Sequence, residues 1–278
     1  MKRMIVFGLV LFTSLASVAW GQWTQLPTAK EPALRGKPVY YDTFDQQWLN
    51  PTKWLATGPF CRGLECVREI QNGHLRLEVR SFGATDSNIG LQSSESELDF
   101  ANPNAISSIT ADVVLRSFSG TGCSTNNTEG TFTRVQIGGY YFNTGTGDSA
   151  DDVTSLLILS VDTTDPKTVK VSAFWYVSGQ GGWTDIDSYP IGTPLTETLA
   201  WDKANHQFIA IVKARGEPGP GKEVMLPYSI SDTTPAVSPR RTIDAVVWSS
   251  NCTSTQTYAQ VEAFYDNVLI NSYPLPSK

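Results

Sequence analysis

Three carboxylates alternate along one short segment, Glu95 to Asp99 (ESELD). In a β-strand, residues two apart share a face, so Glu95, Glu97 and Asp99 would line up at steps of ~6.6 to 7 Å. Retaining glycosidases use two carboxyl groups about 5 to 5.5 Å apart, one as nucleophile and one as acid/base. The sequence Asn102-Pro103-Asn104 follows directly and favours the alternative, a solvated strand end or turn without a catalytic role.

Exposed aromatic rings offer a second kind of chemistry, because the C–H faces of sugars stack on flat rings that have a polar edge. Trp183 follows the glycine-rich turn Gly179 to Gly182 and is the ring most expected at the surface. We predict a sugar-binding platform made of these residues: Tyr140, Tyr141, Trp175, Trp183 and Tyr189. The alternative is that the rings fill the core of a large β fold. Three further tryptophans are expected in the core or at a sheet edge: Trp48, Trp54 and Trp248.

The first and last predicted strands each carry an aspartate. Asp42 lies in Val39 to Phe44 (VYYDTF), and Asp266 lies in Tyr258 to Ile270 (YAQVEAFYDNVLI). Antiparallel sandwiches commonly bring their termini together, so we expect these strands to pair and the two carboxylates to lie close. Calcium takes oxygen ligands that need not be contiguous, which makes a structural calcium site one interpretation. The other is that Asp266 accepts hydrogen bonds from the neighbouring turn.

The four cysteines predict two disulfides in an exported chain. Cys61 and Cys66 close a small loop by themselves. Cys123 and Cys252 both lie in loops rich in Gly, Ser, Asn and Thr, and form the expected long-range pair. A zinc site is the alternative, but the spacing lacks a second CxxC pattern and the two histidines are far away in sequence.

Alternation of apolar and polar residues defines the elements that must hold these groups. In Tyr258 to Ile270 it places Ala259, Val261, Ala263 and Tyr265 on the core face. His74 to Arg80 and Ile109 to Leu115 alternate in the same way, whereas Val153 to Val161 is apolar on both faces and is expected to be central and covered twice. About a dozen such segments without helical periodicity predict an all-β fold of two antiparallel sheets.

The N-terminus has the pattern of a processing signal. Residues 1–21 combine Lys2 and Arg3, an apolar run and a small-x-small cleavage site; residues 22–37 are an N-terminal extension and residues 38–278 a single domain. The run is too short for a membrane span, so we expect a secreted or periplasmic protein. Without Lys2 and Arg3 the chain has 19 basic and 27 acidic residues, a net charge of −8. Such a chain is a poor partner for nucleic acid or anionic membranes.

Several short motifs together resemble the concanavalin A-like lectin/glucanase superfamily, which includes laminin G-like domains. They are Tyr41-Asp42-Thr43-Phe44, the hairpin Asn72 to Leu77 (NGHLRL), Trp201-Asp202 and Tyr265-Asp266-Asn267-Val268. The resemblance implies a two-sheet antiparallel jelly-roll β-sandwich, a concave face that often holds sugar, and sometimes a structural calcium. Laminarinase-type members carry Glu-x-Asp-x-Glu or Glu-x-Asp-x-x-Glu. In this sequence Glu97 and Asp99 match the first two positions, but Ala101 or Asn102 stands where the last glutamate is required.

We therefore expect a secreted, non-catalytic carbohydrate-binding or surface-associated protein whose partner is a glycan or polysaccharide. A glycoside hydrolase or lyase of the same fold is the alternative enzyme class, and a purely structural envelope module is the third. A binding protein predicts exposed aromatic rings without converging carboxylates. An enzyme predicts that Glu95, Glu97 or Asp99 points into the sugar-binding face with a partner.

Overall fold

The computed structural model describes residues 40–55, 61–62, 65–87, 89–123 and 130–273. All of them belong to one compact unit, Gly36–Lys278. The predicted signal and extension lie outside the described residues, so export remains a prediction. Among the residues described, no helix has the length and apolar character to cross a membrane.

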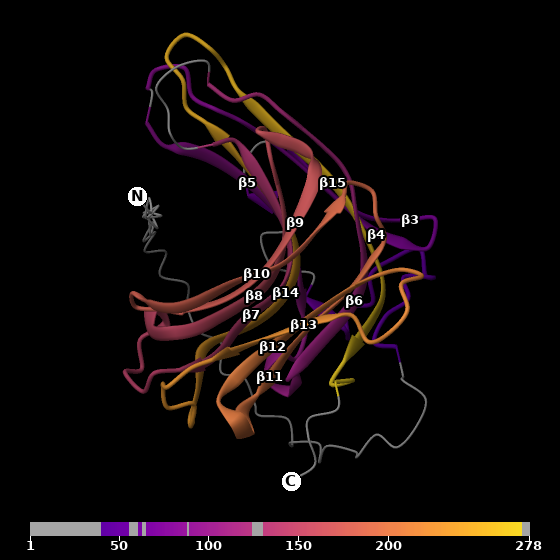
Figure 1. Ribbon diagram of the computed structural model, residues 1–278, viewed down its shortest axis with the longest axis vertical. Helices are drawn as coiled ribbons and strands as arrows, with labels where there is room; N and C mark the ends of the chain where they lie inside the picture. Colours follow the sequence, from indigo (N-terminus) through magenta and orange to yellow (C-terminus); the bar gives the residue numbers. More distant parts are fainter. Residues whose placement is uncertain (1–39, 56–60, 63–64, 88, 124–129, 274–278) are drawn as a thin grey trace. The chain divides into compact units, whose positions relative to one another are not determined.

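The described chain folds into two antiparallel sheets (Figure 1). The eight-stranded sheet has, in spatial order, β1 (Trp54–Leu55), β5 (Leu91–Phe100), β14 (Thr234–Ser250), β7 (Phe132–Asn143), β8 (Asp152–Asp162), β9 (Asp165–Val177) and β10 (Gln180–Pro190), with β2 (Cys61–Arg62) also paired to β5. The seven-stranded sheet has β13 (Lys222–Pro227), β12 (Gln207–Ala214), β11 (Leu195–Asp202), β6 (Ser108–Gly120), β15 (Tyr258–Ile270), β4 (His74–Phe82) and β3 (Glu65–Gln71). Short 3-10 turns lie at Pro103–Ala105, Ser149–Asp151 and Lys203–Asn205. The predicted all-β, two-sheet antiparallel jelly-roll sandwich is confirmed.

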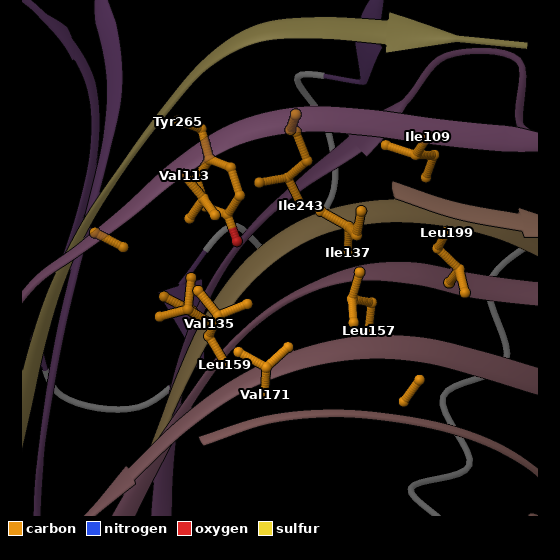
Figure 2. Close-up of a cluster of buried hydrophobic side chains, with 14 of the residues drawn as sticks. Ile109, Val113, Val135, Ile137, Leu157, Leu159, Val171, Leu199, Ile243 and Tyr265 are labelled. Atoms are coloured by element: carbon orange, nitrogen blue, oxygen red, sulfur yellow. The ribbon is translucent and has the colours of Figure 1, made fainter. Parts of the chain in front are cut away.

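The core fills the space between the two sheets (Figure 2). Val135, Leu157 and Ile243 of the eight-stranded sheet point toward Val113 and Tyr265 of the seven-stranded sheet (Figure 2). Each fully buried Leu, Ile or Val side chain contributes about 1.5–3 kcal/mol relative to an exposed one. Alternation therefore fixes which face of each strand is apolar, and burial of that face holds the sheets together.

Strand β15 confirms the predicted faces, since Ala259, Val261, Ala263 and Tyr265 are all fully buried. Its predicted pairing with the N-terminal segment is confirmed at one point only, since β15 is central, between β4 and β6. The segment around Asp42 reaches β15 only through an isolated bridge to Val268. A central strand needs partners along its whole length on both edges, which one short terminal segment cannot provide.

One disulfide joins Cys123, after β6, to Cys252, after β14, across 129 residues of sequence. This confirms the predicted long-range pair. Closing a loop of this length stabilises the fold by about 5 kcal/mol in the chain-entropy model. Cys66 is also disulfide-bonded, while the side chain of its expected partner, Cys61, lies outside what the structure describes.

Candidate binding face of the eight-stranded sheet

The outer face of the eight-stranded sheet is the face that points away from the core. On β5, Leu98 and Phe100 point into the core, so Glu95, Glu97 and Asp99 share the outer face. The carboxylates that alternate in sequence are therefore on one surface.

Strand register continues this face as a row of polar groups across the sheet. Glu97 on β5 lies opposite Asp244 on β14, which lies opposite Gln136 on β7. Beyond Ile158 on β8, the row continues with Ser172 on β9 and Asp185 on β10. We call the five polar residues the polar row: Glu97, Asp244, Gln136, Ser172 and Asp185. None but Glu97 was singled out from sequence, although their position between apolar neighbours marked them as residues of the opposite face.

Arg240 of β14 pairs with carboxylates at the β5 end of the polar row. The guanidinium forms an ion pair with Glu97 and donates from Nε to Asp99 Oδ1 over 2.8 Å. Burial opposes the charge of Arg240, but Asp99 and Glu97 outweigh it and raise its pKa. Burial raises the pKa of Asp99, and Arg240 offsets part of that rise. The carboxylates of β5 are thus held in a fixed ionic network.

Asp244 is the second acidic centre of the row. Burial, together with the nearby charges of Glu95 and Glu97, raises the pKa of Asp244 well above its ordinary value. Its Oδ2 accepts from Gln136 Nε2 and from Thr242 Oγ1, each over 3.2 Å. Glu97 and Asp244 are 2% and 3% exposed, and Glu97 Oε2 and Asp244 Oδ1 are covered. Neither covered oxygen is open to a ligand.

At the β9–β10 end the outer face carries aromatic rings. Trp183 is 53% exposed and stacks on Phe174, with ring centroids 5.4 Å apart and an interplanar angle of 15°. Its indole Nε1 donates to Asp185 Oδ1 over 2.9 Å, and Ser172 Oγ donates to the same oxygen over 2.8 Å. The exposed ring of Tyr176 lies on the same face. We call these rings the aromatic platform: Trp183, Phe174 and Tyr176.

The platform differs from the one predicted. Trp183 is exposed as expected, but Tyr141, Trp175 and Tyr189 are buried in the core, so their predicted exposure is wrong. Trp175 alternates with Phe174 and Tyr176, and the apolar residues Val171 and Ala173 fix its face as the inner one. Tyr140 is half-buried beside the irregularity between β7 and β14.

The three tryptophans expected in the core or at a sheet edge lie in different environments. Trp54 is in the core as predicted, and Trp248 packs on Phe132 on the outer face. Trp48, expected in the core or at a sheet edge, is instead 66% exposed. Its segment, before β1, belongs to no strand, so nothing fixes its ring against a sheet.

The two aspartates proposed for calcium each have protein partners. Asp42 accepts from Phe44 N over 2.9 Å and from Trp54 Nε1 over 2.7 Å. Asp266 accepts from Asn267 N over 2.7 Å and lies 3.4 Å from His74 Nδ1. Within the described ranges, no group of three or more His, Cys, Asp or Glu side chains is arranged to hold a metal ion. Calcium therefore stays a prediction.

A hollow of about 530 Å³ lies on the opposite side of the sandwich, on the outer face of the seven-stranded sheet. It is lined by groups such as His74, Asp112, Arg215, Phe264 and Asp266. Asp112 already binds Arg215 over 3.1 Å and Asn267 Nδ2 over 2.9 Å. Asp112 and Asp266 thus both have partners within or beside this hollow.

No protein-family model matches the chain, and no curated protein is similar to it in sequence. Similar solved structures include a glycosyl hydrolase family protein from Mycobacterium fortuitum, with 12% identity over 82% of this chain and 98% of that one and a TM-score of 0.40. The winged bean acidic lectin in complex with methyl-alpha-D-galactose matches with 11% identity over 84% and 98% and a TM-score of 0.34. Lectin II from Ulex europaeus matches with 8% identity over 79% and 97% and a TM-score of 0.32. Likeness of this degree assigns neither a ligand nor a reaction.

Proposed function

We propose that the protein binds a glycan on the outer face of the eight-stranded sheet and does not cleave it. One observation carries the proposal: Trp183 presents an exposed indole that is fixed by stacking on Phe174 and by its hydrogen bond to Asp185. A rigid ring loses little conformational entropy when a ligand stacks on it. The hydroxyl and carboxylate of the polar row lie beside it and suit the hydroxyl groups of a sugar.

Binding without cleavage follows from the state of the carboxylates. Glu97 and Asp99 share the guanidinium of Arg240, and Glu97 and Asp244 are covered. A nucleophile or acid must reach the scissile bond at hydrogen-bond distance. In this arrangement Glu97 therefore stabilises the charge network of the sheet and does not contact a ligand.

Cleavage is the second candidate, because Glu97 and Asp244 are direct cross-strand partners. Side chains of cross-strand neighbours have Cβ atoms about 4.5–5.5 Å apart, so they can bring two carboxyl groups to the spacing of about 5–5.5 Å used by retaining glycosidases. This function requires a rearrangement that uncovers both carboxyl groups when the glycan binds.

A glycan array with the purified mature protein tests the proposal, run with calcium and with chelator and followed by a reducing-end assay on each hit. We expect binding without new reducing ends. Trp183→Ala should weaken it at least tenfold, about 1.4 kcal/mol. Trp48→Ala is the matched control, since it removes an indole that is also exposed, 66% against 53% for Trp183, and lies outside both sheets. New reducing ends would favour the hydrolase. The absence of any hit would favour a structural envelope module.

Loss of binding on chelation would support the predicted calcium site, and equal binding in both buffers would count against a calcium requirement. Export into the periplasm or medium is a separate expectation and is tested by fractionation.

A further inference from the structure

Arg134 of β7 is a covered cation on the outer face of the eight-stranded sheet. It lies between Thr133 and Val135, whose side chains point inward, and is largely covered by its neighbours. Within the part of the chain that the structure describes, its guanidinium makes no hydrogen bond and no ion pair. Covered charges are normally paired, so an unpaired one calls for an explanation.

Two aromatic rings hold this guanidinium. Phe132 and Trp248 stack with centroids 4.6 Å apart and an interplanar angle of 17°. The Arg134 Cζ atom lies 5.5 Å from the centroid of Phe132 and 5.2 Å from that of Trp248. We call these residues the Arg134 cluster. Ring faces stabilise the flat side of a guanidinium and leave the N–H groups at its edge available.

The acidic groups around the cluster are engaged elsewhere. Asp162, the β8 partner of Phe132, accepts from Thr164 and from Lys170 Nζ over 3.2 Å. The charge of Asp244 acts on Arg134, and burial favours the neutral form of Asp244. Glu95 lies two strands away, beyond Val246. Burial accordingly lowers the pKa of Arg134, with a partial offset from Asp244.

We propose that the Arg134 cluster is a subsite for the carboxylate of an acidic sugar, so that the glycan bound on this face contains uronic acid residues. The inference rests on the proposed function and names its ligand class. A carboxylate matches the planar N–H edge of a guanidinium with two parallel hydrogen bonds. The adjoining rings of Phe132 and Trp248 offer apolar surface to the pyranose that carries the carboxylate.

The cluster and Trp183 are placed to share one ligand. They lie on the same face, separated by two strands between β7 and β10 and by two pairs of residues along the strands. With strands ~4.8 Å apart and ~3.3 Å per residue, this corresponds to roughly 20 Å. An oligosaccharide of several residues reaches both. The net charge of −8 does not prevent this, because charges beyond ~8 Å are largely screened at physiological ionic strength.

The test compares oligouronates with their carboxyl methyl esters, using isothermal titration on the purified mature protein. The free acid should bind at least tenfold more tightly than the ester. Arg134→Gln should bring the acid-to-ester ratio close to one, and Arg134→Lys should give an intermediate ratio because the charge remains without the planar fork. Arg215→Gln removes an exposed cation from the seven-stranded sheet and should leave the ratio as in the wild type.

Equal binding of acid and ester by the wild type would overturn the inference while leaving glycan binding intact. So would a wild-type ratio in a folded Arg134→Gln variant. The ester comparison needs no substitution, so misfolding of a variant cannot obscure it. Failure of the wild type to bind acid, ester and neutral oligosaccharides alike would overturn the proposed function itself.

Discussion

The outer faces of the two sheets bury their charged residues to different extents. On the seven-stranded sheet, Arg76 contacts Glu69, Glu78 and Glu262, and Arg80 contacts Glu65. On the described part of the eight-stranded sheet, Arg240 pairs with the buried Glu97, Arg134 contacts two aromatic rings, and Asp244 is also buried.

The difference separates a solvated surface from the face on which we propose that a ligand binds. Charges that pair with each other across strands keep a sheet soluble and contribute little energy. Covered polar groups without full partners are costly, and their retention beside exposed rings points to function. In the hollow on the seven-stranded sheet, Asp112 and Arg215 pair with each other at the surface.

The largest expected effect contrasts two arginines. Arg240→Ala leaves the charge of buried Glu97 uncompensated and should cost about 3–5 kcal/mol of unfolding free energy in urea titrations. Arg76→Ala, its counterpart on the seven-stranded sheet, should cost about 1 kcal/mol because its acidic partners remain solvated. Equal losses would mean that the two charge networks are equivalent.

Glu197 of β11 is fully buried in the core between the two sheets. Neither of its carboxyl oxygens is hydrogen-bonded in the described structure. Burial raises its pKa well above the usual 4.5, and the charge of Asp244 adds to this. Its contribution to stability is therefore complete below the unfolded pKa and is lost as the pH rises toward the folded one. Glu197→Leu should raise the unfolding free energy at pH 7 by about 2 kcal/mol and reduce its decline between pH 5 and 8.

The control for Glu197→Leu is Glu262→Leu on the seven-stranded face, which breaks one contact of Arg76 and should lower stability slightly. A Glu197→Leu variant less stable than wild type at pH 7 would show that the carboxyl has a partner that stabilises the fold.

A smaller effect is expected at the aromatic platform. A Cβ atom at Gly181 would lie 2.6 Å from the Trp175 carbonyl oxygen and 3.3 Å from Tyr176 Cδ2. Gly181→Ala should thus lower the free energy of unfolding by about 1–2 kcal/mol and weaken glycan binding severalfold by displacing Tyr176. Gly130→Ala, where the Cβ meets nothing within 4 Å, should change neither quantity. Glycan binding unaltered by Gly181→Ala would remove Tyr176 from the platform.

The smallest effect is predicted in the hollow of the seven-stranded sheet. Arg215→Gln breaks an exposed ion pair with Asp112 and should change the unfolding free energy by no more than about 0.5 kcal/mol. Glycan affinity should stay within twofold of wild type. A larger loss of affinity would move the binding site to this sheet and reverse the comparison.

The sequence by itself determined the layers of the fold. Alternation in Tyr258 to Ile270 and in His74 to Arg80 identified the buried residues, because period two divides a strand into two faces whatever its partners are. The doubly apolar Val153 to Val161 marked a central strand, as β8 is between β7 and β9. Its predicted cover on both sides is wrong, because Thr154, Leu156 and Ser160 on the outer face are only half-buried. Loop composition and export context were enough to pair Cys123 with Cys252.

Only the tertiary structure decided which residues meet. Alternation grouped Phe174 with Tyr176 and separated both from Trp175, but did not say which group faces solvent. Glu97, Asp244 and Gln136 come from distant segments and meet through strand order and register. Register depends on pairing between strands and on burial of one face against the other sheet, so it is a property of the assembled sandwich. For the same reason Arg134 was recognisable as a ligand group only after its neighbours were known.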